Sequence, residues 1–307
     1  MARYVRVASV SFRGTRLSTP KETVDRNREE IVRLLKRAAL EEPDVVCLPE
    51  CSPMHGLSGA EMVEAAEEVP GPTFEIVSSI AEEHNMYVVL PLIERKNGRV
   101  YNSAVFIDRS GGYVGSYHKM YPTISEMEAG ITPGTDPVTF KTDFGTVGFA
   151  ICFDLNFRDV IEGLVGRGVE LVFFPSMYPG GLMVRVWSLL YGVYLVSARA
   201  GEGSMIVDPL GRVLTVSSEY SWIICKTLNL DYVVAHLDYN HKKFEEIKRK
   251  YGSKVEIDIT RPEAFFMLTS DTEGVTAEDI VREFNLETRD EYYKRSSKLR
   301  EKHLKTF

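Results

Sequence analysis

The 307-residue sequence has no hydrophobic run long enough to cross a membrane. Its longest apolar stretches, such as residues 169–175, end at a charge or a proline, far short of the roughly 20 residues that a spanning helix needs. The N-terminal stretch MARYVRVASVSFRG also lacks the apolar core of a signal peptide, because Ser11, Arg13 and Thr15 interrupt it. We therefore expect no membrane partner.

Cysteine and net positive charge are scarce as well. The four cysteines are too few to form a disulfide framework in a chain this long, so we expect a reducing, cytoplasmic location. The net charge of -7 argues against a nucleic-acid partner, since phosphate backbones are bound mostly by clustered Lys and Arg. No GxxxxGK[ST] loop is present, which argues against a fused ATP-dependent synthetase.

Up to about residue 240 the sequence alternates short β-type runs with helical stretches. Thr19, Pro20 and Glu22 predict a capped helix start, and apolar residues then recur at helical spacing from Val24 to Ala38. The connections within 96–119 and 204–230 are too short for helical crossovers, so we do not expect a purely parallel sheet. This order predicts an α/β fold in which two sheets form a sandwich with helices outside.

The sequence pattern changes after residue 240, where charged helical segments such as HKKFEEIKRKYG replace the alternation of strands and helices. We expect one domain over 1–240 and a C-terminal extension over 241–307. Because the extension is poor in apolar residues, we expect it to wrap the core or a neighbouring subunit and not to form a separate domain. A solvated, partly frayed tail is the alternative for about the last fifteen residues.

Three residues at the ends of predicted strands could combine in one site. Glu50 ends the strand DVVCLPE, Lys119 ends GGYVGSYHK, and Cys152 ends VGFAIC. Each alone has an ordinary explanation, since a strand cysteine is usually a small buried hydrophobe. Together they would supply an acid/base, a cation and a nucleophile, which is the set that a thiol needs to attack a carbonyl carbon.

The blocks around these residues resemble those of the nitrilase superfamily of carbon–nitrogen hydrolases. NREEIVRLLKRAALEEPDVVCLPE, GRVYNSAVFIDRSGGYVGSYHKMYP, GFAICFDLNFRD and GSMIVDPLGRVL follow the order and spacing of that family over residues 4–235. The resemblance implies a four-layer α-β-β-α sandwich, subunits that pair into a homodimer or higher homo-oligomer, and no metal or organic cofactor.

The same resemblance implies roles for individual residues. Glu50 would be the general base and acid, Lys119 the stabiliser of the tetrahedral intermediate, and Cys152 the nucleophile. The family has a second glutamate in the loop after the lysine, and here we favour Glu128 over Glu126 from its distance to Pro133-Gly134.

Other residues are candidates for substrate contact or for competing sites. We expect the Phe153 N–H to help bind the oxyanion, and Met177 and Tyr178 to line the pocket, with Asp154 and Phe157 shaping its wall. A zinc site at Cys47, Cys51 and His55 is a weaker alternative, because no fourth ligand is evident. His118 beside Lys119 could suggest a Cys-His enzyme, but strand neighbours face opposite sides.

The leading functional hypothesis is hydrolysis of a small amide or N-carbamoyl compound, with release of ammonia or an amine. Nitrile hydrolysis by the same three residues, or a non-catalytic binding or regulatory protein on this fold, are the alternatives. The segment WSLLYGVYLVSARAGEG departs from the pattern common among relatives near the substrate pocket. The sequence therefore leaves the substrate open.

Overall fold

A computed structural model describes residues 2–305 of the chain and divides them into two compact units. The larger unit spans Val5–Leu228, and the C-terminal unit comprises the residues up to Tyr4 together with those from Asn229 onward. No helix in this described part is long and apolar enough to cross a membrane. Each unit is described separately below.

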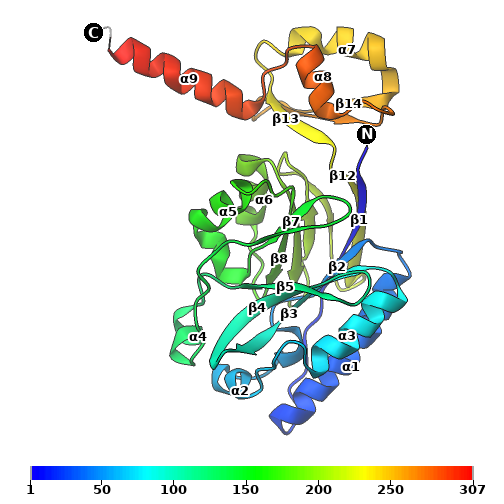
Figure 1. Cartoon of the computed structure of the whole chain (residues 1–307), viewed down its shortest axis with the longest axis vertical. Coiled ribbons are helices and arrows are strands. Elements are labelled where there is room, and N and C mark those ends of the chain that lie inside the picture. Colours follow the sequence, from blue (N-terminus) through cyan, green and yellow to red (C-terminus); the bar gives the residue numbers. More distant parts are fainter. Residues whose placement is uncertain (1, 306–307) are drawn as a thin grey trace. The chain divides into compact units, whose positions relative to one another are not determined.

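The larger unit contains two six-stranded sheets (Figure 1). The strands of the first are, in spatial order, β12 (Ile223–Asn229), β1 (Tyr4–Val10), β2 (Val45–Cys47), β3 (Tyr87–Lys96), β4 (Arg99–Ile107) and β5 (Tyr113–His118). The strands of the second are β11 (Val213–Val216), β10 (Met205–Val207), β9 (Tyr194–Arg199), β8 (Leu171–Ser176), β7 (Thr146–Phe149) and β6 (Thr139–Lys141). The helices of this unit are α1 (Pro20–Ala39), α2 (Gly59–Glu64), α3 (Pro72–Glu83), α4 (Ile124–Glu128), α5 (Arg158–Val165) and α6 (Leu182–Tyr191).

Helices cover the outer face of each sheet, which confirms the predicted four-layer sandwich (Figure 1). The apolar stripe of α1, with Ile31, Leu35 and Ala38, packs with α3 against the first sheet in one buried cluster. α5 and α6 contribute Ile161 and Trp187 to a second cluster against the other sheet. The two inner faces meet through contacts such as that between the rings of Phe106 and Phe149, 5.4 Å apart.

Local sequence signals explain how several elements begin and end. Thr19 and Glu22 form the predicted capping box at the start of α1. The hairpin β3–β4–β5 and the antiparallel pair β10–β11 account for the short connections, so both sheets are mixed as expected. Pro91 lacks a backbone N–H, but β3 loses no hydrogen bond to β2 at this position. The reason is that β2 pairs only with residues 87–89 of β3.

The C-terminal unit has a core of its own, which differs from the expected coreless extension. Its three-stranded antiparallel sheet has the order β13 (Tyr232–His236), β15 (Phe265–Ser270), β14 (Val255–Thr260). Its helices are α7 (Phe244–Tyr251), α8 (Ala277–Glu283) and α9 (Arg289–Leu304). Phe266, Leu268 and Ile280 are fully buried among them.

The expected boundary at residue 240 also differs from the structure, which begins this unit at Asn229. The reason is that β13 continues the run of strand-like sequence but pairs with β15. Residues 289–304 form the exposed helix α9, in which only Arg289 is buried, and the end of the expected tail lies outside the described residues.

Candidate active site

The three candidate residues lie in turns just beyond the ends of strands in both sheets. Lys119 directly follows β5, and Glu50 lies a short distance beyond β2. Cys152 does not end a strand as predicted: β7 stops at Phe149, and Cys152 starts the 3-10 turn Cys152–Asn156. Strand ends are rigid, so these turns hold their side chains in fixed positions, and the structure brings all three together.

The ammonium of Lys119 is the centre of the cluster. Its Nζ donates to Glu50 Oε1 at 2.8 Å and to both carboxylate oxygens of Glu126, at 3.0 and 2.8 Å. Lys119 is only 1% exposed. Burial opposes its charge, but the two carboxylates and the thiol of Cys152 outweigh burial and raise the pKa of Lys119 above its usual range. The side chain is therefore a fixed cation.

The structure places Glu126, and not the favoured Glu128, against Lys119. Glu128 is exposed, at the end of α4, and makes no contact with the cluster. Glu126 is also the third helical residue of a capping box, in which Thr123 N–H donates to its Oε2 at 2.7 Å. Thr123 and Glu126 form the spacing T-x-x-E, so the sequence did contain a signal that selects Glu126.

The carboxylate of Glu50 is buried and receives three donors. Besides Lys119, its Oε1 accepts from Asn102 Nδ2 at 2.8 Å, and its Oε2 accepts from the backbone N–H of Met177 at 2.8 Å. Met177 thus enters the site through its backbone, while its side chain is exposed. These contacts orient the carboxylate, because Oε1 accepts from two side chains and Oε2 accepts from one backbone N–H.

The thiol of Cys152 is nearly buried and close to Glu50. Burial and, after it, the Glu50 carboxylate together raise the pKa of Cys152 to about 12, although Lys119 and a hydrogen bond with Ser176 act to lower it. The thiol therefore carries its proton at neutral pH and needs a base during attack. The backbone of Cys152 has φ of 49°, a left-handed conformation that is strained for a residue with a Cβ and is found preferentially at functional turns.

Asp154 fixes this strained turn to the strand end that carries Lys119. Its carboxylate accepts hydrogen bonds from Tyr117 Oη at 2.7 Å, from Ile151 N–H at 2.8 Å and from Tyr121 N–H at 2.8 Å. Burial raises the pKa of Asp154 to about 6, against the effect of these donors. Asp154 therefore supports the positions of both catalytic candidates instead of lining the pocket wall.

Aromatic side chains surround the turn. Phe157 stacks on Tyr121 with ring centroids 3.7 Å apart and meets Phe153 edge to face. The side chain of Phe153 is 37% exposed, and Tyr178 is half-buried. The Tyr178 hydroxyl interacts electrostatically with Cys152, while burial is the main cause of its raised pKa. These rings form an apolar boundary around the polar cluster.

His55 makes contacts that differ from those expected of a zinc ligand. Both of its ring nitrogens are occupied: Nε2 contacts the Glu50 carbonyl oxygen at 2.7 Å, and Nδ1 accepts from Gly14 N–H at 3.2 Å. Within residues 2–305, no three His, Cys, Asp or Glu side chains form a group that could hold a metal ion. His55 instead holds the backbone of Glu50.

His118 does not join the cluster around Lys119. Its ring stacks on Tyr101, with centroids 4.0 Å apart, and its Nε2 lies 3.2 Å from Glu94 Oε2. This position follows from strand alternation, which directs neighbouring side chains to opposite faces.

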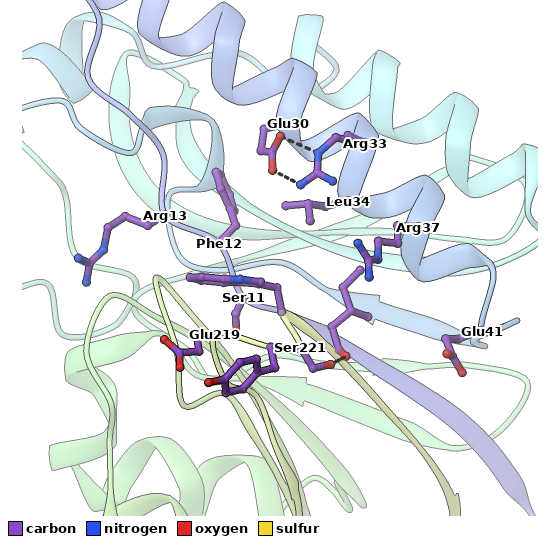
Figure 2. Close-up of a pocket in the computed structure, with 13 residues that line it drawn as sticks. Ser11, Phe12, Arg13, Glu30, Arg33, Leu34, Arg37, Glu41, Glu219 and Ser221 are labelled. Carbon is purple, nitrogen blue, oxygen red and sulfur yellow. Dashed lines mark hydrogen bonds and ion pairs between the residues drawn. The ribbon is translucent and has the colours of Figure 1, made fainter.

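A cavity of about 520 Å³ lies elsewhere, between α1 and residues 219–223 (Figure 2). Its lining includes Arg13, Arg37 and the ion pair between Glu30 and Arg33, which face each other on α1. Neither the thiol nor any member of the Lys119 cluster lines it. We therefore place the chemistry at Cys152 and not in this cavity.

Known proteins resemble the chain in sequence and in fold. Omega-amidase NIT2 of Xenopus tropicalis is 25% identical over 261 residues, covering 76% of this chain and 91% of that protein. Human omega-amidase NIT2 is 26% identical over 223 residues, covering 64% of this chain and 80% of that protein.

Solved structures share the fold of the larger unit. An amidase from Nesterenkonia sp. has a TM-score of 0.66 at 19% identity, covering 80% of this chain and 96% of that one. Saccharomyces cerevisiae Nit3, described as a member of the nitrilase superfamily, has a TM-score of 0.63 at 20% identity, covering 81% and 95%.

The family model described as carbon-nitrogen hydrolase matches residues 6–236, about three quarters of the chain. This range contains both sheets, apart from the first two residues of β1, and it includes Glu50, Lys119, Glu126 and Cys152. The resemblance inferred from the sequence blocks is thereby confirmed, and the chain belongs to the carbon-nitrogen hydrolase family.

Proposed function

We propose that the protein hydrolyses a small amide or N-carbamoyl compound through a thioester on Cys152. One observation carries this proposal: a buried ammonium, Lys119, is held between the carboxylates of Glu50 and Glu126 beside a buried thiol. This arrangement supplies a nucleophile, a base and a fixed positive charge within one small volume. No metal or organic cofactor enters the proposed steps.

The first half-reaction forms the thioester. Glu50 accepts the thiol proton while the sulfur of Cys152 attacks the carbonyl carbon, which avoids a free thiolate in a buried site. The oxyanion that forms is stabilised by the Lys119 ammonium and the backbone N–H of Phe153. Protonated Glu50 then gives its proton to the leaving nitrogen, the carbon–nitrogen bond breaks, and ammonia or an amine departs.

The second half-reaction releases the acid. Glu50 takes a proton from a water molecule, which attacks the thioester carbon. The carbon–sulfur bond breaks, the thiol regains a proton from Glu50, and a carboxylic acid leaves. Glu126 stays ionised throughout: burial raises its pKa, but Lys119 and its hydrogen-bond donors outweigh burial and lower it. Glu126 thereby keeps Lys119 charged without acting on substrate.

The relatives support an amide as the substrate class. Two relatives that are 25% and 26% identical to this chain are named omega-amidases. One solved structure of the Nesterenkonia amidase is described with the acetamide moiety of fluoroacetamide added covalently at its active site cysteine. We therefore expect amides of short carboxylic acids to be better substrates than nitriles.

The test is ammonia release from a panel of aliphatic amides, omega-amides of dicarboxylic acids, N-carbamoyl amino acids and nitriles. We expect turnover of at least one amide, and a loss of at least about 1,000-fold in kcat for Cys152→Ala, because the nucleophile is absent. Mass spectrometry of wild-type protein quenched with acid during turnover should detect an acyl adduct at Cys152, and Glu50→Gln should form this adduct far more slowly, because it lacks both the base and the acid of the first half-reaction.

Cys225→Ala is the matched control, because Cys225 is also a free cysteine but lies on β12, outside the Lys119 cluster. It should keep wild-type activity. Full activity of folded Cys152→Ala would refute the proposed nucleophile, and wild-type protein that turns over only nitriles would refute the amide assignment.

We also propose a homo-oligomer and a cytoplasmic location. Leu182 and Leu190 on α6 are 69% and 57% exposed, which favours a covered face in an assembly. All four cysteines are free, which is compatible with a reducing compartment. Sedimentation at several protein concentrations tests the first proposal, and localisation of a tagged protein tests the second.

A further inference from the structure

Asn102 is a fully buried residue of β4 to which the sequence patterns assigned no role. Its Nδ2 donates to Glu50 Oε1 at 2.8 Å and to Glu126 Oε1 at 2.7 Å. Its backbone carbonyl oxygen accepts from the backbone N–H of Lys119 at 2.8 Å. One residue therefore contacts three members of the proposed site.

The orientation of the Asn102 amide follows from its neighbours. The two protons of Nδ2 serve two carboxylates, and a rotated amide would direct Oδ1 at both of these negative groups. In the present orientation Oδ1 is buried and has no hydrogen-bond partner within residues 2–305. An unpartnered buried carbonyl costs free energy. The hydrogen bonds from Nδ2 to the two carboxylates therefore outweigh the cost of leaving Oδ1 without a partner.

The contacts form a closed ring of two donors and two acceptors. Lys119 Nζ and Asn102 Nδ2 each contact both Glu50 Oε1 and Glu126 Oε1, at distances from 2.7 to 3.0 Å. One ammonium cannot neutralise two carboxylates, and carboxylates that share a buried site favour protonation of one of them. An amide supplies two further donors without adding a second positive charge.

We propose that Asn102 is a positioning residue that holds Glu50 and Glu126 in ionised form on one Lys119 ammonium, so that Glu50 is free to accept the Cys152 proton. This inference rests on the proposed function. Besides Lys119 and Cys152, the titratable groups that act on this pair of carboxylates are Cys51, His55 and Tyr178. Without the amide donors, one carboxylate takes up a proton at a higher pH, and the base is lost.

The experiment compares two substitutions at this position. Asn102→Leu keeps the approximate size and removes both donors, whereas Asn102→Asp keeps the shape and adds a third carboxylate. With the best amide substrate, Asn102→Leu is expected to lower kcat about 100-fold with KM within threefold. In Asn102→Leu the acidic limb of the kcat–pH profile moves to a higher pH by about one unit. In Asn102→Asp it moves to a still higher pH.

Ser103→Ala is the matched control, because Ser103 is the adjacent fully buried residue of β4 and its side chain faces the other side of the sheet. It keeps kcat within threefold and leaves the pH profile unchanged. Circular dichroism melts of all variants report whether each one folds.

Two results overturn the inference: a wild-type kcat and pH profile in Asn102→Leu, or a loss of activity with an unshifted acidic limb in the residual rate. If the wild-type protein hydrolyses none of the panel, the proposed function fails. The rate at which iodoacetamide alkylates Cys152 then tests the inference. Peptide mass mapping then follows carbamidomethylation of Cys152 by iodoacetamide against pH. An unchanged pH dependence of this rate in Asn102→Leu overturns the inference, and an upward shift supports it.

Discussion

His55 couples the position of Glu50 to pH through a single ring. Burial lowers the pKa of His55 to about 4, although its hydrogen bond to the Glu50 carbonyl acts in the opposite direction. An unfolded histidine has a pKa of about 6.5, so the unfolded state binds more protons between these two values. The stabilisation from neutral His55 is complete above pH 6.5, and up to about 3 kcal/mol of it is lost as the pH falls to 4.

We therefore predict that His55→Gln flattens the pH dependence of stability. Urea unfolding at pH 7.5 and at pH 4.5 measures the difference in free energy of unfolding, which should be smaller in His55→Gln than in the wild type by up to about 3 kcal/mol. His84→Gln is the control, because His84 lies at the end of α3 with its side chain 31% exposed. Equal pH dependence in His55→Gln and the wild type would contradict the prediction.

Residue patterns predicted part of this site. Glu50, Lys119 and Cys152 could be selected because each ends a predicted strand in a block that resembles one family, and the structure brings them together. Glu126 could have been selected from its capping-box spacing, whereas distance to a Pro-Gly pair indicated the wrong neighbour. Asn102 could not be found from local sequence, because its contacts with Glu50 and Glu126 span 52 and 24 positions. His55 was noted only as a zinc candidate, whereas its ring contacts the backbone of Glu50.

The five-residue helix α4 has a second task besides connecting strands. Its N-cap, Thr123, accepts from Glu126 N–H, and Glu126 in turn accepts from Thr123 N–H and from Lys119. The first turn of the helix therefore sets the direction of the carboxylate that binds Lys119. We predict that Thr123→Ala lowers kcat about tenfold, because a small displacement of Glu126 misplaces the ammonium.

Thr19→Ala is the control for this change, since Thr19 forms the same capping box at the start of α1. Each substitution should cost about 1 kcal/mol of stability, but only Thr123→Ala should change kcat. Steady-state kinetics on the amide substrate and urea unfolding measure the two effects. A loss of kcat in both variants would show that general destabilisation is the cause.

Elements were easier to predict than their ends. Capping signals located α1, and the short connection within 96–119 excluded a helical crossover where β4 and β5 pair antiparallel. The end of β7 was misplaced because a strand continues only while a neighbour offers backbone partners, and β7 pairs with β8 only as far as Phe149. The apolar run to Cys152 gave no sign of that loss.

The whole chain contains a second folding unit that composition alone did not reveal. Charged residues dominate the sequence after 240, yet Val255, Phe266 and Leu286 are buried in one cluster. A small sheet needs only alternate apolar positions, so its average composition stays polar. The family model ends at residue 236, so most of this unit lies outside the part that the family shares.

Because the hydrophobic clusters of the two units share no residues, we predict that a core substitution in one unit loosens that unit alone. Phe266→Ala removes a fully buried ring at the centre of the C-terminal cluster and should cost about 3–5 kcal/mol there. Phe174→Ala removes an equally buried ring beside α5 and α6 and is the reciprocal variant.

Hydrogen–deuterium exchange should become faster in β13–β15 for Phe266→Ala and in β7–β9 for Phe174→Ala. Amide hydrolysis at moderate temperature should fall only in Phe174→Ala, since Cys152 lies beside that cluster. Faster exchange throughout the chain in Phe266→Ala would mean that the two units unfold as one.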